Sequence, residues 1–323
     1  MEQNIIKYII LFSILVFSCT EKNETIKRST VAMGTVMEIQ IRGVGESLAN
    51  KAIDESFREF KRLDTLFSTY LKNNEMWRIN NSISDTITVS GEYFYILNQC
   101  DRYWKESGGA FDPAIGNIID LVGFEKGNPK LPSPEMIKEA LKKTGWKKIK
   151  LEEPNVLIKP SQIKLSFNAC IPGYAADRVA QILTGNGINN FLVNAGGEIF
   201  AKGNNWKVGI QHPRKQNEFL NSILIDGTSV STSGDYQQYF KKDGKRYSHI
   251  FNPATGMPAN ELEAVTIIAK DALTSDALST VVFILGKEKG IKLIEKLPGV
   301  EGLIVDTTGT IYQSSGFGKY ILR

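Results

Sequence analysis

The chain has 323 residues, of which 42% are hydrophobic and 23% charged, with 28 glycines and 11 prolines. This composition excludes collagen-like, low-complexity and wholly disordered proteins, and the length suits one large domain or two ordinary ones. The net charge of +4 is too small and too scattered to predict a nucleic-acid partner. Two histidines and three widely spaced cysteines leave little material for zinc or copper sites, so a bound metal should have oxygen ligands.

The amino terminus has the features of an export signal. Residues 5–17 form an apolar run interrupted only by Lys7 and Ser13, which is too short to span a bilayer and is typical of a secretory signal. The segment Val16-Phe-Ser-Cys19 resembles a bacterial lipobox, in which the chain is cut before a cysteine that then carries lipid. A simple signal peptide or a buried N-terminal strand is the alternative interpretation.

These features predict the domain organisation and the location. We expect residues 1–18 to be removed, Cys19 to be the lipid anchor, residues 19–29 to be a polar tether and residues 30–323 to form the folded domain. The mature protein would then be held at a bacterial membrane, facing the periplasm or the cell surface.

The rest of the chain predicts a mixture of helices and strands. Helical periodicity covers residues 46–66, 91–105, 133–143, 174–183, 275–285 and 290–296. Strands are expected at residues 35–41, 164–167, 190–194, 206–210, 222–226 and 265–269, and a hairpin at residues 300–306 and 310–313. Because the elements do not alternate as βαβ units and no GxGxxG follows a strand, the pattern favours an α+β fold over a Rossmann fold.

Two cysteines lie within the predicted domain. Cys100 and Cys170 could pair in an exported protein, but their spacing in the sequence gives no distance between them. The simpler interpretation is that each is a small buried hydrophobic residue.

Five short segments are rich in Gly, Asp, Ser and Thr: residues 33–35, 107–113, 194–198, 232–236 and 247–256. Each alone has the composition of a turn. Most adjoin a predicted strand or helix end, however, where backbone N–H groups are available to bind an anion. Together they suggest a site that could bind an anion.

Two further features suggest catalysis. Asp276 and Thr280 are four residues apart on a predicted helix, so their oxygens share one face and suit Mg²⁺, although an ordinary capped helix is the alternative. His249 follows a predicted hairpin and has polar neighbours, although a lone histidine is often only structural.

Eight motifs, taken in order, resemble the FAD:protein FMN transferase family of ApbE-like lipoproteins. They are Met33-Gly-Thr35, Phe67-Ser-Thr-Tyr70, Gly109-Ala-Phe-Asp112, Gly173-Tyr-Ala-Ala-Asp177, Asn194-Ala-Gly-Gly197, Ser233-Gly-Asp235, His249-Ile-Phe-Asn-Pro-Ala-Thr-Gly256 and Asp276-Ala-Leu-Ser-Thr280. The resemblance implies mixed, mostly antiparallel sheets with packed helices. It also implies an enzyme that uses Mg²⁺ to split FAD and attaches FMN through a phosphoester to a Thr or Ser hydroxyl of a flavin-carrying subunit of a membrane redox complex.

The resemblance also implies the roles of individual residues. The metal would be held by the side chains of Asp276 and Thr280 and by the backbone carbonyl of Ala169, and His249 would lie near the reacting phosphate as the base. FAD would contact Met33, Tyr70, Ala110, Phe111, Asp112, Ser166, Pro172 and Ile250. At two of these positions the chain departs from the family, which usually has Asp where Ser166 stands and Lys where Pro172 stands. This departure bears on FAD affinity and on selectivity for its adenosine half.

Three functions are consistent with these residues. A transferase would leave FMN covalently bound to an acceptor protein. A Mg²⁺-dependent FAD pyrophosphatase would release FMN and AMP, because water would take the place of the acceptor. A non-catalytic flavin-binding lipoprotein would retain FAD unchanged, but such a protein would not need the Asp276 and Thr280 pair.

Overall fold

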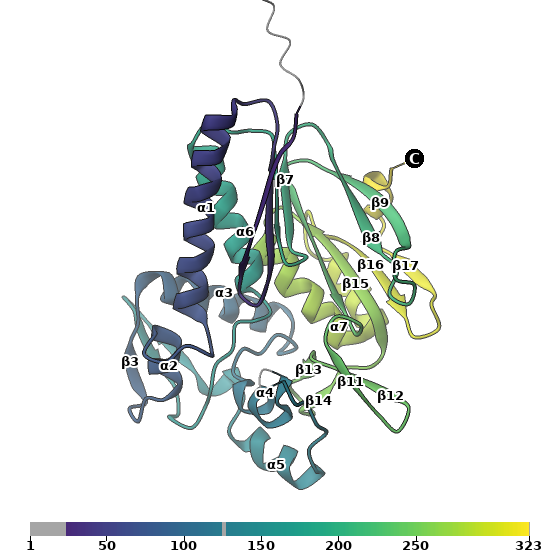
Figure 1. Cartoon of the computed structure of the whole chain (residues 1–323). Coiled ribbons are helices and arrows are strands. Elements are labelled where there is room, and N and C mark those ends of the chain that lie inside the picture. The colour runs from purple at the N-terminus through teal and green to yellow at the C-terminus, as the bar shows by residue number, and fades with distance from the viewer. Residues whose placement is uncertain (1–23, 125–126, 323) are drawn as a thin grey trace, which may run out of the picture.

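The computed structural model describes residues 24–124 and 127–322 (Figure 1). The predicted signal and the predicted anchor Cys19 lie outside these residues. No helix in the described part of the chain has both the length and the apolar character needed to cross a membrane.

An eight-stranded sheet forms the centre of the molecule. Its order is β1 (Ile26–Ala32), β2 (Thr35–Ile41), β6 (Phe191–Ala195), β7 (Ile199–Lys202), β10 (Thr228–Gly234), β15 (Leu262–Ala269), β16 (Glu301–Asp306) and β17 (Ile311–Gln313). Every neighbouring pair in it is antiparallel. The predicted α+β class with mostly antiparallel sheets is confirmed, as is the hairpin of β16 and β17.

The folded domain begins earlier than the predicted boundary at residue 30. Strand β1 starts at Ile26 and pairs with β2 in unbroken register from Ile26 opposite Ile41 to Ala32 opposite Thr35. Four of the seven residues of β1 are polar, from Lys27 to Thr30, and this composition is also that of a polar tether.

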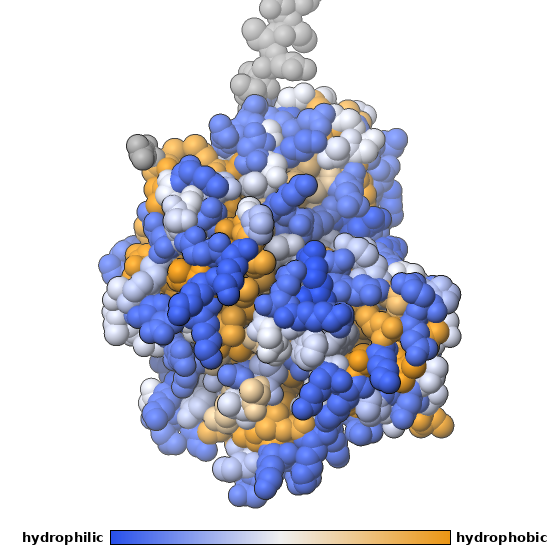
Figure 2. Space-filling model, turned by 180° about the vertical axis from the view of Figure 1, so that it is seen from behind, coloured by the Kyte–Doolittle hydropathy of each residue, from blue (hydrophilic) through white to orange (hydrophobic). Residues whose placement is uncertain are grey.

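Helices cover one face of the sheet and a hairpin covers the other. Helices α1 (Glu46–Phe67), α6 (Ile171–Gly185) and α7 (Ala272–Ile294) enclose the larger core, with α3 (Gly91–Glu106) at its lower edge (Figure 1). On the opposite face, β8 (Trp206–Gln211), β9 (Phe219–Ile225) and the turn η3 (Phe317–Tyr320) bury a smaller core. The surface seen from behind is mostly hydrophilic, with apolar side chains in scattered groups (Figure 2).

Shorter elements form the lower part of the molecule in Figure 1. They are α2 (Glu75–Asn80), α4 (Gly116–Val122), α5 (Pro134–Lys142), η2 (Trp146–Lys148), β3 (Thr86–Thr88), β4 (Lys150–Glu152), β5 (Val156–Ile158), β11 (Tyr239–Lys242), β12 (Lys245–Ser248), β13 (Phe251–Asn252) and β14 (Met257–Pro258). Strands β3, β5 and β4 make a small sheet, and β11 and β12 make the predicted hairpin before His249.

Two predicted elements differ in the structure. The segment 164–167 is not a strand, because its backbone bonds to isolated partners: Leu165 N–H donates to Asn80 Oδ1, and Ser166 N–H donates to the Pro113 carbonyl. The helices predicted at 275–285 and 290–296 belong to one element, α7, which is interrupted by the non-helical backbone of Gly286.

Helices α6 and α7 approach each other unusually closely at Gly173. A Cβ atom on Gly173 would lie 2.3 Å from the Ala272 carbonyl oxygen and 2.7 Å from Asp276 Cβ. Since real side chains do not tolerate such distances, this crossing requires glycine.

We therefore predict that Gly173→Ala lowers the free energy of unfolding by about 1–3 kcal/mol, the usual cost of overpacking a rigid core. Urea denaturation measures this change. The matched control is Gly185→Ala in the same helix, where a Cβ meets nothing within 4 Å. The control should be neutral or stabilising by up to about 1 kcal/mol, since alanine favours helix more than glycine does. Equal effects of the two substitutions would contradict the tight crossing.

Candidate active site

The first turns of α6 and α7 cap each other. Gly173 N–H in α6 donates to Asp276 Oδ2 in α7 at 2.9 Å. In return, Asp177 in α6 accepts hydrogen bonds from the backbone N–H groups of Ala272 at 2.7 Å and Leu273 at 2.9 Å, in the first turn of α7. Each helix thus supplies a carboxylate to the free N–H groups of the other, which fixes both helix ends.

The Asp276 carboxylate is buried, and few interactions offset the cost of burying its charge. It is 5% exposed, and burial raises its pKa to about 7, although the Gly173 hydrogen bond opposes this shift. Within residues 24–124 and 127–322, no lysine or arginine forms an ion pair with it. A bound cation would supply the missing compensation, because a buried carboxylate is costly unless it is paired or coordinated.

Thr280 lies one turn after Asp276, at the end of a row of buried hydroxyl groups. Its Oγ1 is 3.3 Å from Ser233 Oγ in β10, which also bonds to Ser279 Oγ at 2.8 Å. Further along β10, Ser231 Oγ lies 2.8 Å from Ser275 Oγ. These bonds tie α7 to the central sheet over the stretch that carries Asp276 and Thr280.

The loop before α6 carries the third predicted metal ligand. Ala169 is two residues before the first residue of α6 and four before Gly173, whose N–H meets Asp276. Ser166, in the same segment, has a buried Oγ with no hydrogen-bond partner among the described residues. Pro172 occupies the first turn of α6, where it lacks an N–H to donate.

These donors fit Mg²⁺. One carboxylate, one hydroxyl and the backbone carbonyl of a nearby loop are hard oxygen ligands, and Mg²⁺ commonly uses one or two carboxylates together with substrate phosphates and water. In the described part of the chain, no group of three or more His, Cys, Asp or Glu side chains could hold a metal. A soft or borderline metal therefore has no suitable set there.

Glu198 is a second carboxylate that interacts electrostatically with Asp276, and it is not among the site residues that the sequence predicts. The pKa of Glu198 is raised well above its ordinary value by burial and by the charge of Asp276. Glu198 follows the turn at Gly196, which has φ 83° and approaches Thr35 so closely that a Cβ would lie 2.5 Å from Thr35 Cγ2. This contact brings the segments 33–35 and 194–198 together.

Met33 lies in the tight turn between β1 and β2. Met33 and Gly34 both have positive φ, 52° and 72°, as a two-residue hairpin turn of type I′ requires. The predicted flavin contact at Met33 is therefore on a rigid hairpin tip next to the 194–198 turn. Tyr70, another predicted contact, is 67% exposed in the loop after α1.

His249 follows the β11–β12 hairpin and packs in a small aromatic group. Its ring lies against Phe124, with 6.3 Å between ring centroids, and burial lowers its pKa below the ordinary value. Its Nδ1 is 3.2 Å from the Gln238 carbonyl oxygen, which can only accept, so Nδ1 carries the hydrogen and Nε2 keeps the lone pair. The neighbouring Ile250 is buried, and its carbonyl accepts from Ala259 N–H at 2.8 Å.

Of the predicted contacts in this segment, Ala110 and Phe111 have buried side chains and Asp112 is half-buried. Phe111 packs edge-on against Tyr103 at 5.6 Å. Asp112 accepts hydrogen bonds from the backbone N–H groups of Ala114 and Trp146, so its carboxylate shapes this turn. A contact from this segment to FAD would therefore come mainly from its backbone.

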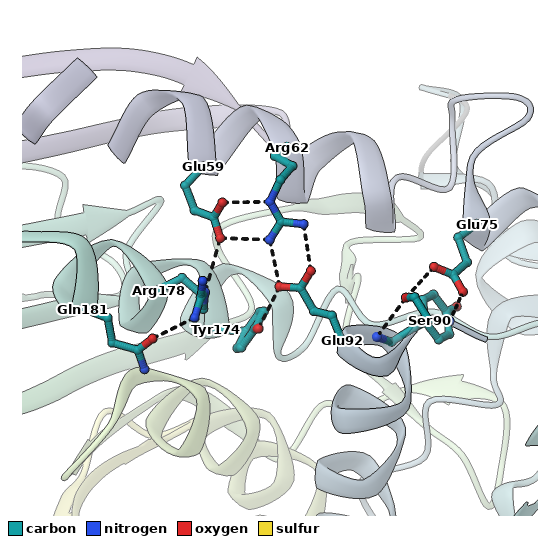
Figure 3. A network of polar contacts seen from close by, with 9 residues as sticks. Glu59, Arg62, Glu75, Ser90, Glu92, Tyr174, Arg178 and Gln181 are labelled. Carbon is teal, nitrogen blue, oxygen red and sulfur yellow. Dashed lines mark hydrogen bonds and ion pairs between the residues drawn. The ribbon is translucent and has the colours of Figure 1, made fainter. Parts of the chain in front are cut away.

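An ion-pair network fixes the outer side of α6 (Figure 3). Arg62 in α1 donates to Glu59 and Glu92 at 2.7–2.9 Å, and Tyr174 in α6 donates to Glu92 at 2.8 Å. Arg178 in α6 also bonds to Glu59. The Arg62 guanidinium lowers the pKa of both glutamates, so the network stays charged at neutral pH and joins α6 to α1 and α3.

The fold is that of the ApbE class of flavin transferases. The ApbE family model matches residues 33–304, and the chain belongs to the ApbE family. The predicted family is thereby confirmed.

Named relatives and solved structures are similar to this chain over most of its length. The FAD:protein FMN transferase of Haemophilus influenzae is 31% identical, over 94% of this chain and 93% of that protein. The FAD:protein FMN transferase of Escherichia coli K12 is 32% identical, over 84% of this chain and 81% of that protein. The ApbE protein of Thermotoga maritima superposes with a TM-score of 0.86 at 31% identity, covering 93% of this chain and 100% of its own. The flavin transferase ApbE of Vibrio cholerae gives 0.83 at 29% identity, covering 92% and 99%.

Asp177 should make the stability of the protein depend on pH. Burial raises its pKa to about 7, above the ordinary 3.8, even though two N–H groups oppose the shift. Its stabilising contribution is therefore complete below pH 3.8 and is lost as pH rises through about 7. Between pH 5 and 8 we predict a loss of about 2 kcal/mol that Asp177→Asn lacks. Urea unfolding across this range measures it, and parallel pH curves for the two proteins would contradict it.

Proposed function

We propose that this protein is a Mg²⁺-dependent FAD:protein FMN transferase. In the reaction, a Thr or Ser hydroxyl oxygen of an acceptor protein attacks the FMN phosphorus of FAD. The new P–O bond is a phosphoester, the pyrophosphate P–O bond breaks, and AMP leaves. The observation that carries the proposal is the buried Asp276, which has no Lys or Arg ion-pair partner among the described residues and stands one helical turn from Thr280. Similarity to FAD:protein FMN transferases over most of the chain supports it.

Asp276, Thr280 and the Ala169 carbonyl would hold the metal. When bound, Mg²⁺ neutralises the charge on a pyrophosphate and so makes its phosphorus easier to attack. The protein contributes rigidity, because the Gly173 hydrogen bond and the hydroxyl row on β10 hold Asp276 and Thr280 in fixed positions.

His249 would take the proton from the acceptor hydroxyl. Its lowered pKa keeps it neutral at pH 7, and its Nδ1–H bond to Gln238 leaves Nε2 as the proton acceptor. A hydroxyl is a weak nucleophile, so a positioned base increases its reactivity.

Flavin binding would combine the hairpin tip at Met33, the exposed Tyr70, the backbone of 110–112, the first turn of α6 at Pro172 and the segment around Ile250. The neutral hydroxyl of Ser166 has no hydrogen-bond partner among the described residues, which suits a hydrogen bond to FAD where the family usually has a carboxylate.

The acceptors would be flavin-carrying subunits of membrane redox complexes. Lipid on Cys19 would hold the enzyme at a bacterial membrane on the periplasmic or outer side. The run of residues 5–17 and the lipobox-like segment that follows it support this location.

Mass spectrometry tests the reaction directly. We predict that the enzyme, FAD, Mg²⁺ and an acceptor peptide yield the peptide plus one FMN on a Thr or Ser, together with AMP. Free FMN and AMP without labelled peptide would instead indicate a pyrophosphatase, and unchanged FAD would indicate a flavin-binding protein.

A matched pair of variants tests the metal site. Thr280→Val should lower the transfer rate roughly 10–100-fold and raise the Mg²⁺ concentration needed for half-maximal transfer. Thr280→Ser keeps the hydroxyl and should stay close to wild type.

The pH dependence tests the role of His249. We predict that His249→Ala lowers the transfer rate by roughly 10²–10⁴-fold, the range for loss of a general base. In the unmodified enzyme the rate should fall as pH drops below the ordinary histidine pKa of 6.5, because protonated His249 cannot accept a proton. The control is His212→Ala, which removes the other histidine of the chain. A flat rate from pH 5 to 8 would argue against His249 as the base.

A further inference from the structure

Charged side chains from four segments meet where the β11–β12 hairpin leaves the central sheet. They are Asp235 just after β10, Arg246 in β12, Arg214 in the loop between β8 and β9, and Glu263 in β15. Both carboxylates are largely buried, with side-chain exposures of 13% for Asp235 and 8% for Glu263. Figure 1 shows the hairpin projecting from the lower end of the sheet, so this cluster lies at its base.

Asp235 holds two guanidinium groups on one oxygen. Arg214 binds it with two hydrogen bonds, from Nη1 to Oδ1 at 2.7 Å and from Nη2 to Oδ2 at 2.8 Å. Arg246 Nη1 also donates to Oδ1, at 3.2 Å. Arg214 Nε lies 2.9 Å from Glu263 Oε1, which fixes Arg214 to the central sheet. The two cations can lie this close together because the charge between them attracts both.

The hairpin carries His249 at its end and is rigid within itself. Its strands pair in unbroken register, and its Phe240 and Tyr247 rings stack at 5.2 Å. His249 directly follows β12, and the Gln238 carbonyl accepts from its backbone N–H at 3.1 Å and from its ring Nδ1 at 3.2 Å. Because this carbonyl belongs to the hairpin, the orientation of the hairpin determines how the His249 ring is held.

Arg246 links the hairpin to the charged cluster. Its guanidinium also lies over the Tyr239 ring of the neighbouring strand, 4.3 Å from the ring centroid. A second contact near the base is aromatic, since Phe124 packs against the Phe240 and His249 rings. Ring pairs are favourable over a range of separations and angles, whereas hydrogen bonds between charged groups are directional. The cluster therefore supplies the more precise constraint on the hairpin.

We propose that Asp235 is a positioning residue for His249. It keeps Arg214 and Arg246 together, and so holds the hairpin at the angle at which the Gln238 carbonyl fixes the Nδ1–H form of the His249 ring. The inference rests on the proposed role of His249 as the base. Without a negative charge at position 235 the two guanidinium groups would repel each other. Since Glu263 retains Arg214, the hairpin that carries Arg246 would be the part that moves.

Nitrogen NMR of the histidine rings tests the proposal without flavin transfer. The full chain is produced with ¹⁵N-labelled histidine, and only two rings give signals because the chain has two histidines. The signals that persist in His212→Ala belong to His249. At pH 8 the parent protein should carry the ring hydrogen of His249 on Nδ1. In Asp235→Asn, which removes the charge at nearly constant shape, the Nε2–H form that free histidine prefers should become the major one.

Two further variants separate positioning from a general loss of stability. Glu263→Gln removes the other carboxylate of the cluster but leaves Asp235 with both of its guanidinium groups, so the Nδ1–H signal should persist. Arg246→Gln breaks the link on the half-buried hairpin side and should shift the ring to Nε2–H even where Asp235→Asn fails to fold. A persisting Nδ1–H signal in folded Asp235→Asn or Arg246→Gln, or its equal loss in Glu263→Gln, would overturn the proposal.

A double-mutant cycle tests whether Asp235 acts through His249. Asp235→Asn should lower the rate of FMN transfer roughly 10–100-fold, the cost of displacing a reacting group by about 1 Å. In a His249→Ala background the same change should lower the rate less than about 2-fold, because the group that it positions is already absent. Equal losses in both backgrounds would contradict the positioning role. A parent protein that transfers no FMN would contradict the proposed function, and the NMR measurement would still decide the role of Asp235.

Discussion

The site depends on the reciprocal capping of α6 and α7. Asp276 accepts from the first turn of α6, and Asp177 accepts from the first turn of α7, so two carboxylates are exchanged between two helix ends. The exchange requires that residue 173 have no side chain, because a Cβ there would collide with the Ala272 carbonyl. One glycine thus determines how closely the helices approach, and that approach sets where the Asp276 carboxylate lies relative to the loop that carries Ala169.

The arrangement also explains why a metal suits this position. Asp276 is buried against a helix end that only partly compensates its charge, and Glu198 adds a second negative charge nearby. Such a pair is unfavourable until it gains protons or a cation. The network around Arg62 and the hydroxyl row of β10 form a rigid frame for the proposed site. The negative charge held in this frame would be compensated by a divalent ion, which would also bind a pyrophosphate.

Amphipathic periodicity was enough to predict α1 and α3, whose buried apolar residues lie in the larger core. The cap residue Ser133 and the following Pro134 were enough to predict the start of α5. Periodicity failed for residues 164–167, which alternate like a strand but bond to the Asn80 side chain and to a loop carbonyl. The four-residue spacing of Asp276 and Thr280 singled out this pair, and the motif resemblance then implied that the pair holds a metal. The partnership of Asp177 with the start of α7 joins residues about a hundred positions apart, and no local pattern marks such a contact. The flavin contacts and the metal ligands stay predictions.

The most direct test of this account is where a divalent ion binds. Crystals of the protein soaked with Mn²⁺ and FAD would reveal the metal by its anomalous scattering. The account predicts one strong peak coordinated by Asp276, by Thr280 and by the Ala169 carbonyl, with the flavin pyrophosphate completing its shell. A peak at another position, or Asp276 and Thr280 turned into packed side chains with no metal beside them, would contradict it.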